Sequence, residues 1–342
     1  MGCNICSAIE DSLDFETKYN AKGLYRFINK SGECCINSFL QIFLHNQLIT
    51  DVINSINQTD INKDQNEGKL INAINKLLNE IRNNVIILNP IEIKEAMICI
   101  NEEYKNNSAD ANDFICDFIN ELISEIPKKE EFKINIPSNE IASQALIKLI
   151  NRFYKKNNSI FIELFFGNSM IEYYCIKGHL LDIKFNTFIT IDLGLYSFKD
   201  KKTIKIEELL DYSFNSIKNQ DFTKMCKICG DNNNCYEKHY IYSLPKILIL
   251  YISRNFENCF FDNKIEFKNE INMEKYIKYN DKISTKYKLF GIIQNINGHY
   301  NSATINNDDN NWYFFNDDYE PSTVNKDLNK FNPVFLFYNL TY

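Results

Sequence analysis

Apolar side chains recur every three or four residues along the first half of the chain, a spacing that places them on one face of a helix. The pattern predicts four amphipathic helices, beginning at or just after Cys34 and then covering about residues 70–81, 111–123 and 140–154. A polar loop is expected between the first two helices, over residues 57–68. The N-terminal half is therefore predicted to be helical.

Beyond about residue 160 the pattern changes to short apolar or alternating runs bounded by turn residues, which is typical of β-strands. Strands are expected over residues 159–166, 188–193, 244–253, 287–293, 300–305, 312–316 and 334–339. Helices followed by strands favour an α+β architecture over a doubly wound sheet. A chain of 342 residues is long enough for one large domain or for two lobes with a cleft between them.

Composition and charge exclude several classes of function. The net charge is −7, and no run of five or more Lys or Arg occurs. Because nucleic-acid-binding surfaces are normally basic, no DNA or RNA partner is expected. No apolar run approaches the roughly 18 residues that a membrane span requires. The eleven cysteines are odd in number and no secretory leader is expected, so they are interpreted as thiols in a reducing, intracellular compartment.

The most informative candidate chemistry lies between Gly23 and Gln41. A glycine-containing loop leads to Cys34 at the start of the first predicted helix. Unpaired backbone N–H groups and the helix dipole favour an anion at such a position, so a thiolate would be stabilised there. The alternative interpretation is that Cys34, or its neighbour Cys35, is a small core residue.

This segment resembles the cysteine box of ubiquitin-specific proteases, which reads Gly-Leu, a few residues, Asn, Gly and then Cys-aromatic-x-Asn-Ser-x-Leu-Gln. The matching positions are Gly23, Leu24, Asn29, Cys34, Asn37, Ser38, Leu40 and Gln41. The resemblance implies that Cys34 is the nucleophile and that Asn29 donates a hydrogen bond to the oxyanion. Asn29 could otherwise be a turn residue. The departures are the shifted Gly32, Cys35 in place of an aromatic residue, and Glu33, whose carboxylate would oppose thiolate formation.

The chain has four histidines. Two of them are interpreted as surface residues, and a third lies within a motif. His45 and His239 are interpreted as surface residues from their positions in the pattern. His299 follows Gly298 at the mouth of two predicted strands and precedes Tyr300. This Gly-His-Tyr resembles the end of the family's histidine box, which implies that His299 is the general base.

The segment from Trp312 to Asp318 resembles the box that supplies the third member of the family's triad. The alignment puts Asn316 in that role. An amide oxygen can accept a hydrogen bond from the imidazole and fix its tautomer, which suffices for a cysteine nucleophile. Asp317 is expected either to assist Asn316 or to face solvent.

Two weaker matches extend the resemblance over about residues 23–340. Residues 110–114 resemble the Asp-Ala-x-Glu-Phe that opens a helix of the family's thumb, and residues 333–338 resemble its closing strand. The resemblance implies a papain-like cysteine protease fold. Its helical thumb, β fingers and β-rich palm would cover about residues 23–158, 159–245 and 246–342.

The same resemblance implies a deubiquitinase, which hydrolyses the (iso)peptide bond after the C-terminal glycine of ubiquitin through a Cys thioester. Ubiquitin or ubiquitinated proteins would be its partners. Three alternatives remain open at this stage. They are a catalytically inactive ubiquitin-binding module of the same fold, a protease for another ubiquitin-like modifier, and an unrelated α+β scaffold with chance matches.

Members of the family often hold a structural zinc ion with two Cys-x-x-Cys pairs. Cys226 and Cys229 match the second pair, whereas the first pair keeps only Cys175 and has glycine at its other position. A tetrahedral site needs four ligands, so His179 or Cys235 would have to complete the set. The expectation is that the site is lost, and no metal or cofactor is assigned.

Residues 1–22 show no sustained periodicity and are interpreted as a tail. Gly2 beside Cys3 would permit N-myristoylation and palmitoylation, and stable anchoring would require both lipids. Cys6 stands where Ser or Thr is preferred, so an unmodified tail is the default. The expected location is the cytoplasm, with anchoring at a membrane surface as the alternative.

Overall fold

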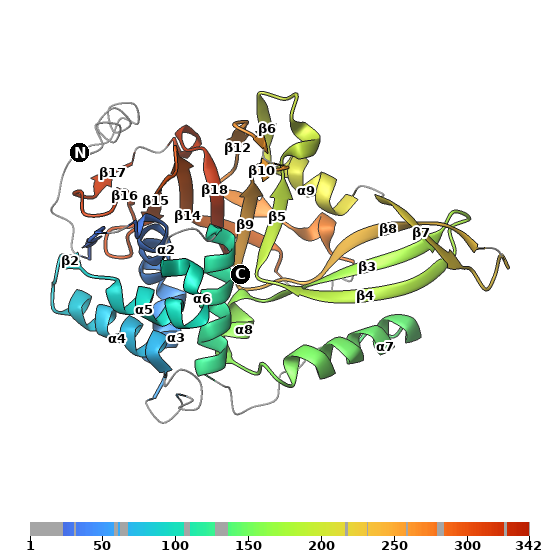
Figure 1. Ribbon diagram of the computed structural model, residues 1–342, viewed down its shortest axis with the longest axis horizontal. Helices are drawn as coiled ribbons and strands as arrows, with labels where there is room; N and C mark the ends of the chain where they lie inside the picture. Colours follow the sequence, from blue (N-terminus) through green and yellow to red (C-terminus); the bar gives the residue numbers. More distant parts are fainter. Residues whose placement is uncertain are drawn as a thin grey trace.

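The computed structural model describes residues 23–30, 32–57, 61, 68–105, 110–126, 136–215, 218–230, 232–257, 259–278, 284–324 and 327–341. The expected tail, with Gly2, Cys3 and Cys6, lies outside the described residues, as does most of the expected loop at residues 57–68. The described part forms a helical lobe, a large sheet and a projecting smaller sheet (Figure 1). We call these the thumb, the palm and the fingers.

Five helices of the N-terminal half pack together as the thumb (Figure 1). They are α2 (Cys34–His45), α3 (Gln47–Asn54), α4 (Lys69–Arg82), α5 (Ile91–Ile100) and α6 (Ala111–Glu125). The helices predicted at α2, α4 and α6 are confirmed, as is the one at α7 (Glu140–Leu149), which continues to Tyr154. Helix α5 was not predicted, because its apolar residues partly alternate.

Residues 159–166 were expected to form a strand, and this prediction is wrong. They form helix α8 (Ile160–Phe165), which is capped by the Ser159 hydroxyl at 3.4 Å from the backbone N of Phe161. Most side chains of α8 are buried, so the run is apolar on every face. A short apolar run of this kind has no periodicity that distinguishes a buried strand from a buried helix.

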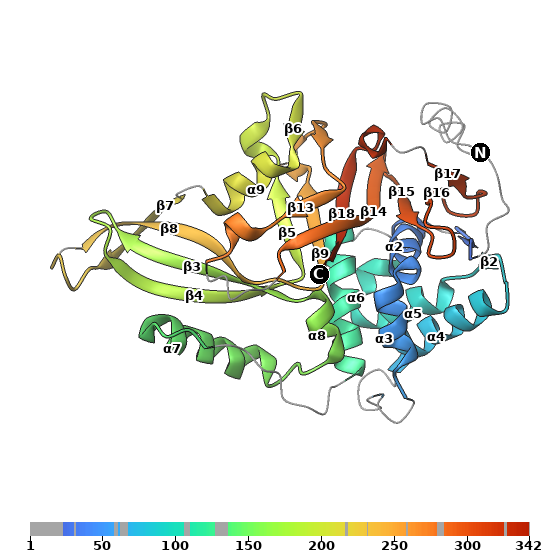
Figure 2. The ribbon, with the colours of Figure 1, turned by 180° about the vertical axis from the view of Figure 1, so that it is seen from behind.

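The palm is an eight-stranded sheet in the order β17-β16-β15-β14-β18-β9-β5, with β13 also paired to β14 (Figure 2). Its strands are β5 (Thr190–Gly194), β9 (Ile247–Ser253), β13 (Glu270–Asn272), β14 (Lys286–Ile296), β15 (His299–Ile305), β16 (Trp312–Phe315), β17 (Ser322–Thr323) and β18 (Pro333–Leu340). The strands predicted at β9, β14, β15, β16 and β18 are confirmed. The strand expected over 188–193 lies at β5, shifted by two residues at its start.

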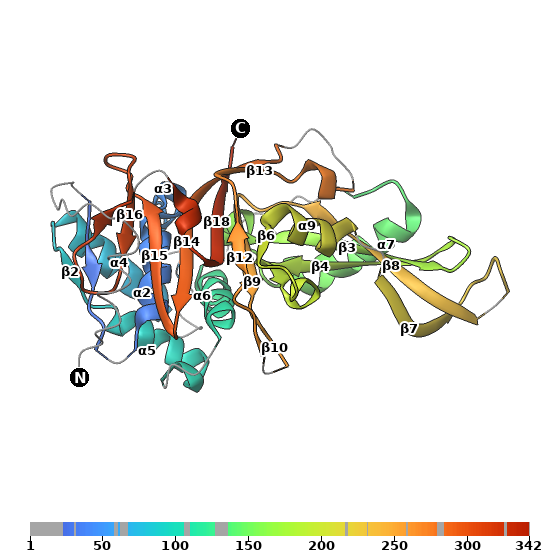
Figure 3. The same cartoon turned by 90° about the horizontal axis from the view of Figure 1, so that it is seen from above.

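The fingers are a four-stranded antiparallel sheet that projects from the palm (Figures 1 and 3). The sheet order is β4-β3-β8-β7, and the strands are β3 (Gly167–Cys175), β4 (Leu180–Phe188), β7 (Lys218–Met225) and β8 (Asn232–Ser243). Helix α7 packs along β4. The expected fingers range of 159–245 also contains α8, which packs against α6, and β5, which belongs to the palm sheet.

The remaining short elements connect these three parts. They are β1 (Arg26–Phe27) paired with β2 (Ile87–Leu88), β6 (Thr203–Lys205) paired with β12 (Lys264–Glu266), β10 (Asn255–Phe256) paired with β11 (Cys259–Phe260), helix α9 (Ile206–Asn215), and single helical turns at 102–105, 196–198, 274–276 and 328–330. None of the described helices is long and apolar enough to cross a membrane.

The palm sheet is buried on both faces, with one core on each. Along β18, Phe335 and Phe337 belong to the core shared with the thumb, whereas Leu336 and Tyr338 belong to the core behind the sheet. This alternation follows from the two-residue period of a strand. On the thumb side, Phe39 of α2 contacts the aromatic rings of its neighbours at centroid separations of 5.1–6.4 Å. The expected α+β architecture, with a helical thumb, a β-rich palm and β fingers, is confirmed.

Helix α2 lies directly against β14 and β15. At Gly291, the absence of a side chain permits this close approach, because an added Cβ would lie 2.7 Å from Cγ2 of Ile42. We predict that Gly291→Ala lowers the free energy of unfolding by about 1–3 kcal/mol through overpacking. Chemical denaturation would measure this loss. Gly194→Ala is the control, because a Cβ there meets no atom within 4 Å.

Truncation of the opposing side chain should relieve the clash. In the Ile42→Ala background the added cost of Gly291→Ala is expected to be smaller than in the wild type, since contacting residues are energetically coupled. Equal costs in the two backgrounds would contradict the packing explanation.

Candidate active site

Cys34 is the first residue of α2, as predicted, and its side chain is half-buried. The preceding turn contains Gly32 at φ +85°, a left-handed conformation that favours glycine. Cys34 opens onto a cavity of about 190 Å³, which is also lined by Gly32, Cys35, Ile36, Tyr104, Phe114, Gly298 and Tyr300. The thiol therefore lies at the positive end of a helix and beside a cavity with aromatic walls.

His299 is brought to this thiol by the hairpin of β14 and β15. Ile296 pairs with His299, and the two residues between them, Asn297 and Gly298, both have positive φ. Two such residues form the type of tight turn that matches the twist of a hairpin. The turn therefore places His299 at the start of β15, a strand that packs against α2.

The imidazole of His299 lies between two polar partners. Its Nε2 is 2.6 Å from Oδ1 of Asn316, and because an amide oxygen only accepts hydrogen bonds, this Nε2 carries a hydrogen. A hydrogen bond with Cys34 raises the pKa of His299 to about 9, opposed by burial and aided by Asn316 and Asp317. The structure thus joins His299 to Asn316 by a hydrogen bond and places its ring close enough to Cys34 for the thiol to raise its pKa.

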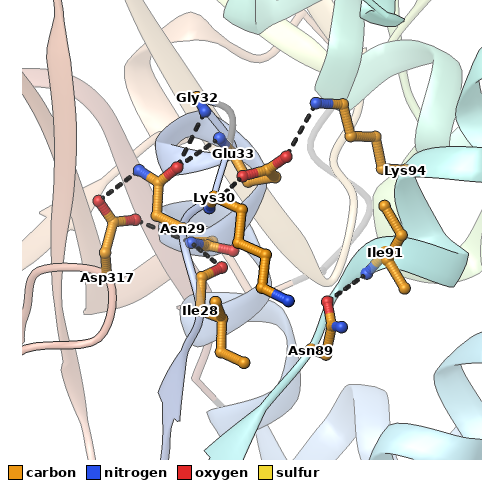
Figure 4. Close-up of polar contacts among 10 residues, drawn as sticks. Ile28, Asn29, Lys30, Gly32, Glu33, Asn89, Ile91, Lys94 and Asp317 are labelled. Carbon is orange, nitrogen blue, oxygen red and sulfur yellow. Dashed lines mark hydrogen bonds and ion pairs between the residues drawn. The ribbon is translucent and has the colours of Figure 1, made fainter.

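Asp317 does not face solvent. Its carboxylate is buried, and accepts hydrogen bonds from Nδ2 of Asn29 at 2.7 Å and from Nδ2 of Asn37 at 2.8 Å (Figure 4). It also lies 3.6 Å from Nε2 of His299. Burial raises its pKa, while the bonds from the two amides oppose that rise. Asn37 matched the family pattern in the sequence, but its contact with Asp317 was not anticipated.

Asn29 lies in the loop before α2, and three hydrogen bonds of its side chain hold that loop in place. Its Oδ1 accepts the backbone N–H groups of Gly32 at 2.9 Å and Glu33 at 3.0 Å, while its Nδ2 donates to Asp317 (Figure 4). These bonds fix the direction of the amide close to the start of α2. This geometry is compatible with the oxyanion role that the sequence resemblance implies for Asn29.

Glu33, whose charge was expected to oppose a thiolate, is paired with a lysine. Its carboxylate accepts a hydrogen bond from Nζ of Lys94 in α5 at 2.9 Å, and both side chains are buried. Lys94 was not identified from the sequence. A lysine within the unpredicted helix α5 carries no motif, so only its position in the fold reveals it.

Of the two histidines that were expected at the surface, one is buried. His45 was interpreted as a surface residue, and this is wrong. Its ring is buried, stacked on Tyr25 and hydrogen-bonded to the Tyr25 hydroxyl at 3.0 Å, and burial lowers its pKa to about 4. His239 is partly exposed and pairs with Glu237 at 2.6 Å.

A second cluster lies in the two turns of the fingers. Cys175 and His179 flank the turn between β3 and β4, and Cys226 and Cys229 lie between β7 and β8. Their four ligand atoms lie within 4.8 Å of one another. His179, rather than Cys235, completes the group. These four residues are the set of three cysteines and one histidine that the sequence offered as the alternative to loss of the site.

The distances in this cluster fit a zinc ion. The Sγ atoms of Cys175 and Cys229 are 3.8 Å apart, and Nδ1 of His179 lies 3.5 Å, 3.1 Å and 3.7 Å from the sulfurs of Cys175, Cys229 and Cys226. Zinc bonds of about 2.3 Å to sulfur and about 2.0 Å to nitrogen place tetrahedral ligand atoms roughly 3.5–3.8 Å apart. Backbone N–H groups of His179 and Cys229 also point at the sulfurs of Cys175 and Cys226.

The comparisons with known proteins decide the family. The model of the ubiquitin carboxyl-terminal hydrolase family matches residues 25–338, which is nearly the whole chain. The chain belongs to the ubiquitin carboxyl-terminal hydrolase family. It is a cysteine-type deubiquitinase, as the sequence resemblance indicated.

Individual relatives in this hydrolase family agree. Ubiquitin carboxyl-terminal hydrolase 8 of Saccharomyces cerevisiae is 25% identical over 356 aligned residues, which cover 93% of this chain and 71% of the yeast protein. Ubiquitin carboxyl-terminal hydrolase 9 of Arabidopsis thaliana is 27% identical over 122 residues, which cover 33% of this chain and 13% of the plant protein.

Two solved structures share the hydrolase fold. A chain of the SAGA DUB module of Ubp8, Sgf11, Sus1 and Sgf73 bound to monoubiquitin superposes with a TM-score of 0.74, at 22% identity and over 99% of this chain and 74% of that chain. The same module bound to ubiquitin aldehyde gives a TM-score of 0.72 at 20% identity, with the same coverage. These likenesses establish the fold of the hydrolase domain.

The raised pKa of His299 leads to a testable prediction. Because the hydrogen bond with Cys34 is its main cause, Cys34→Ala should lower the pKa of His299 from about 9 toward the ordinary value near 6.5. NMR titration of the imidazole signals would measure the shift. Cys99→Ala, which removes an exposed thiol of α5, is the control and should leave the titration unchanged. An unaltered His299 titration in Cys34→Ala would show that the two side chains do not interact.

Proposed function

We propose that Cys34 is the nucleophile, His299 the general base and acid, and Asn316 the residue that orients the imidazole of this deubiquitinase. The observation that carries the proposal is the position of the His299 ring. It is hydrogen-bonded to Asn316, and its two chain neighbours, Gly298 and Tyr300, line the same cavity as Cys34. Its raised pKa favours an imidazolium beside a thiolate. A thiolate formed in advance needs no carboxylate in the third position, so Asn316 suffices.

The proposed reaction proceeds in two stages. His299 takes the thiol proton, and the sulfur of Cys34 forms a bond to the carbonyl carbon of the terminal glycine of ubiquitin, whose π electrons move to oxygen. His299 then gives the proton to the departing amine as the C–N bond breaks, which leaves a thioester. In the second stage His299 deprotonates a water molecule, which attacks the thioester carbon, and the C–S bond breaks.

Two groups would stabilise the oxyanion in both stages. The side-chain amide of Asn29, fixed in direction by Asp317, would donate one hydrogen bond. The backbone N–H at the start of α2 would donate another. Loss of one such donor in other hydrolases costs about 10²–10³-fold in rate.

The substrate is proposed to be ubiquitin or a ubiquitinated protein. The cavity of about 190 Å³ beside Cys34 has aromatic walls formed by Tyr104, Phe114 and Tyr300. A narrow channel of this kind admits an extended tail that ends in glycines more readily than one with large side chains. The structural neighbours bound to monoubiquitin and to ubiquitin aldehyde support the same substrate. The globular part of ubiquitin would then rest on the fingers and palm.

A ubiquitin–fluorophore hydrolysis assay tests the proposal. We predict that Cys34→Ala lowers kcat by at least about 10³-fold, because no other group can form the thioester. Cys99→Ala should retain the wild-type rate, and ubiquitin with a C-terminal electrophile should label Cys34 alone, as mapped by mass spectrometry.

The alternatives give different results in the same assay. A folded wild-type protein that binds ubiquitin without turning it over would be an inactive binding module. Faster turnover of another ubiquitin-like modifier in a panel of probes would reassign the substrate. Labelling at a thiol other than Cys34 would refute the proposed nucleophile.

We further propose that Cys175, His179, Cys226 and Cys229 hold a structural zinc ion at the fingers. When bound, the ion would join the β3–β4 turn to the β7–β8 turn, a purely structural contribution. Four ligands from the protein would leave no open position for chemistry.

Metal analysis of the purified protein tests the zinc proposal. We predict one equivalent of zinc in the wild type and its loss in His179→Ala, because three ligands do not complete the tetrahedron. Cys235→Ala is the matched control, since this neighbouring buried thiol lies outside the cluster and its removal should leave the metal content unchanged. A wild-type protein purified without zinc, and unable to bind it when refolded in its presence, would disprove the site.

The location of the protein is also a proposal. We infer a cytoplasmic enzyme from the many cysteines, which form no disulfide among the described residues, with anchoring through lipids on Gly2 and Cys3 as the alternative. Mass spectrometry of the N-terminal peptide from the native source would distinguish an acylated from an unmodified terminus.

A further inference from the structure

Glu33 immediately precedes the nucleophile and occupies the cap position of α2, yet its carboxylate does not cap the helix. It turns back, so that Oε2 accepts the backbone N–H of Lys30 at 2.9 Å and Oε1 accepts Nζ of Lys94 at 2.9 Å (Figure 4). Each of the two side chains is only 5% exposed. The N–H groups at the start of α2 are therefore not capped by a carboxylate next to Cys34.

A buried ion pair at this place needs a reason other than stability. Taking two charges out of water costs several kcal/mol per ion, and well-packed apolar residues are often as good or better. The pair lies one residue from the nucleophile and at the end of the loop that carries Asn29. This location points to a role in the reaction.

We propose that Glu33 and Lys94 are positioning residues, which hold the loop of the oxyanion donor against the thumb and cancel a negative charge beside Cys34. This inference rests on the proposed roles of Cys34 and Asn29. Glu33 itself does not touch the substrate in this proposal, and it acts through the loop and through the electric field at the thiol.

The described residues of the loop 29–33 are held from two sides. Asn29 donates to Asp317 at the palm, and Glu33 accepts from Lys94 of the thumb helix α5 (Figure 4). The two anchors are linked, because the Glu33 backbone N–H donates to Oδ1 of Asn29. Movement of Glu33 would therefore displace the amide of Asn29.

There is space for such movement. A cavity of about 260 Å³ lies beside the loop, lined by Ile28, Lys30, Glu33, Asn89 and Ile91. Loss of the contact with Lys94 would leave Glu33 at the wall of this cavity without its cation. Displacement of a donor by about 1 Å can cost up to about 10²-fold in rate.

The electrostatic part of the proposal depends on all the ionisable groups around Cys34. His299 of β15 interacts with the thiol from the palm, and Asp317 after β16 lies 3.6 Å from the His299 ring. Asp110 at the start of α6 lies close enough to raise the pKa of Cys35 and Tyr300, the ionisable neighbours on α2 and β15. Glu33 without Lys94 would add one more carboxylate to this group.

The two single substitutions have opposite electrostatic consequences. In Lys94→Met, the uncompensated carboxylate of Glu33 opposes thiolate formation. The acid limb of the pH profile of kcat/KM should then move to higher pH. In Glu33→Gln, the uncompensated ammonium of Lys94 favours the thiolate, and the acid limb should move to lower pH. If Glu33 and Lys94 had only a structural role, the acid limbs of the two variants would not move in opposite directions.

The experiment compares wild type, Glu33→Gln, Lys94→Met and the double variant Glu33→Gln/Lys94→Met in the ubiquitin–fluorophore assay over a range of pH. We expect each single variant to lose about tenfold or more in kcat with KM within about twofold, because the loop and not the ubiquitin surface is disturbed. The double variant should return the acid limb to its wild-type position, and should be at least as stable as the single variants in thermal unfolding.

The control is Glu92→Gln, which breaks an exposed ion pair between Glu92 of α5 and Lys76 of α4. It should leave both kcat and the acid limb unchanged. Folded single variants with wild-type kcat and wild-type acid limbs would overturn the proposal. So would acid limbs that move in the same direction in both variants.

A second measurement keeps this inference separate from the proposed function. The rate of Cys34 alkylation by iodoacetamide, followed by mass spectrometry against pH, reports the thiolate without ubiquitin. Opposite displacements of this profile in the two single variants support the pair even if the wild type hydrolyses no ubiquitin conjugate. Identical profiles refute the electrostatic role even if the wild type is fully active.

Discussion

One buried carboxylate joins the two halves of the active site. Asp317, at the end of a palm strand, accepts hydrogen bonds from Asn29 and Asn37 on the α2 side and lies next to His299. This contact ties the loop before α2 directly to the palm, in addition to the packing of α2 on β14 and β15. The distance between thiol and imidazole, on which the chemistry depends, is therefore determined by a group that does not take part in bond making.

The sequence was sufficient wherever the apolar pattern had a clear period. Helices α2, α4 and α6 each bury one face, and the palm strands are apolar runs bounded by turns, so both were predictable. The sequence was insufficient where a segment is buried on nearly all sides or shows no regular apolar pattern. Helix α8 is buried on nearly all sides and resembled a strand, while strand β3 mixes polar and aromatic residues without a simple alternation.

The same contrast holds for the site. Cys34, His299 and Asn316 could be proposed from the sequence because they lie in motifs whose register is local. Lys94 could not, because its importance depends on a contact with Glu33 across sixty-one positions of the chain. His45 was misassigned for a related reason, since a polar ring at a helix end is buried here by Tyr25 and Phe315, which come from distant segments.

The packing of α2 on β14 and β15 has a consequence for biosynthesis. Helix α2, which carries Cys34, is translated before the strands β14 and β15 that cover it. Its large aromatic side chains remain without their final partners until those strands have been made. A nascent chain of this kind is exposed to aggregation in the interval, and the thiol cannot meet its imidazole before the histidine hairpin has been synthesised.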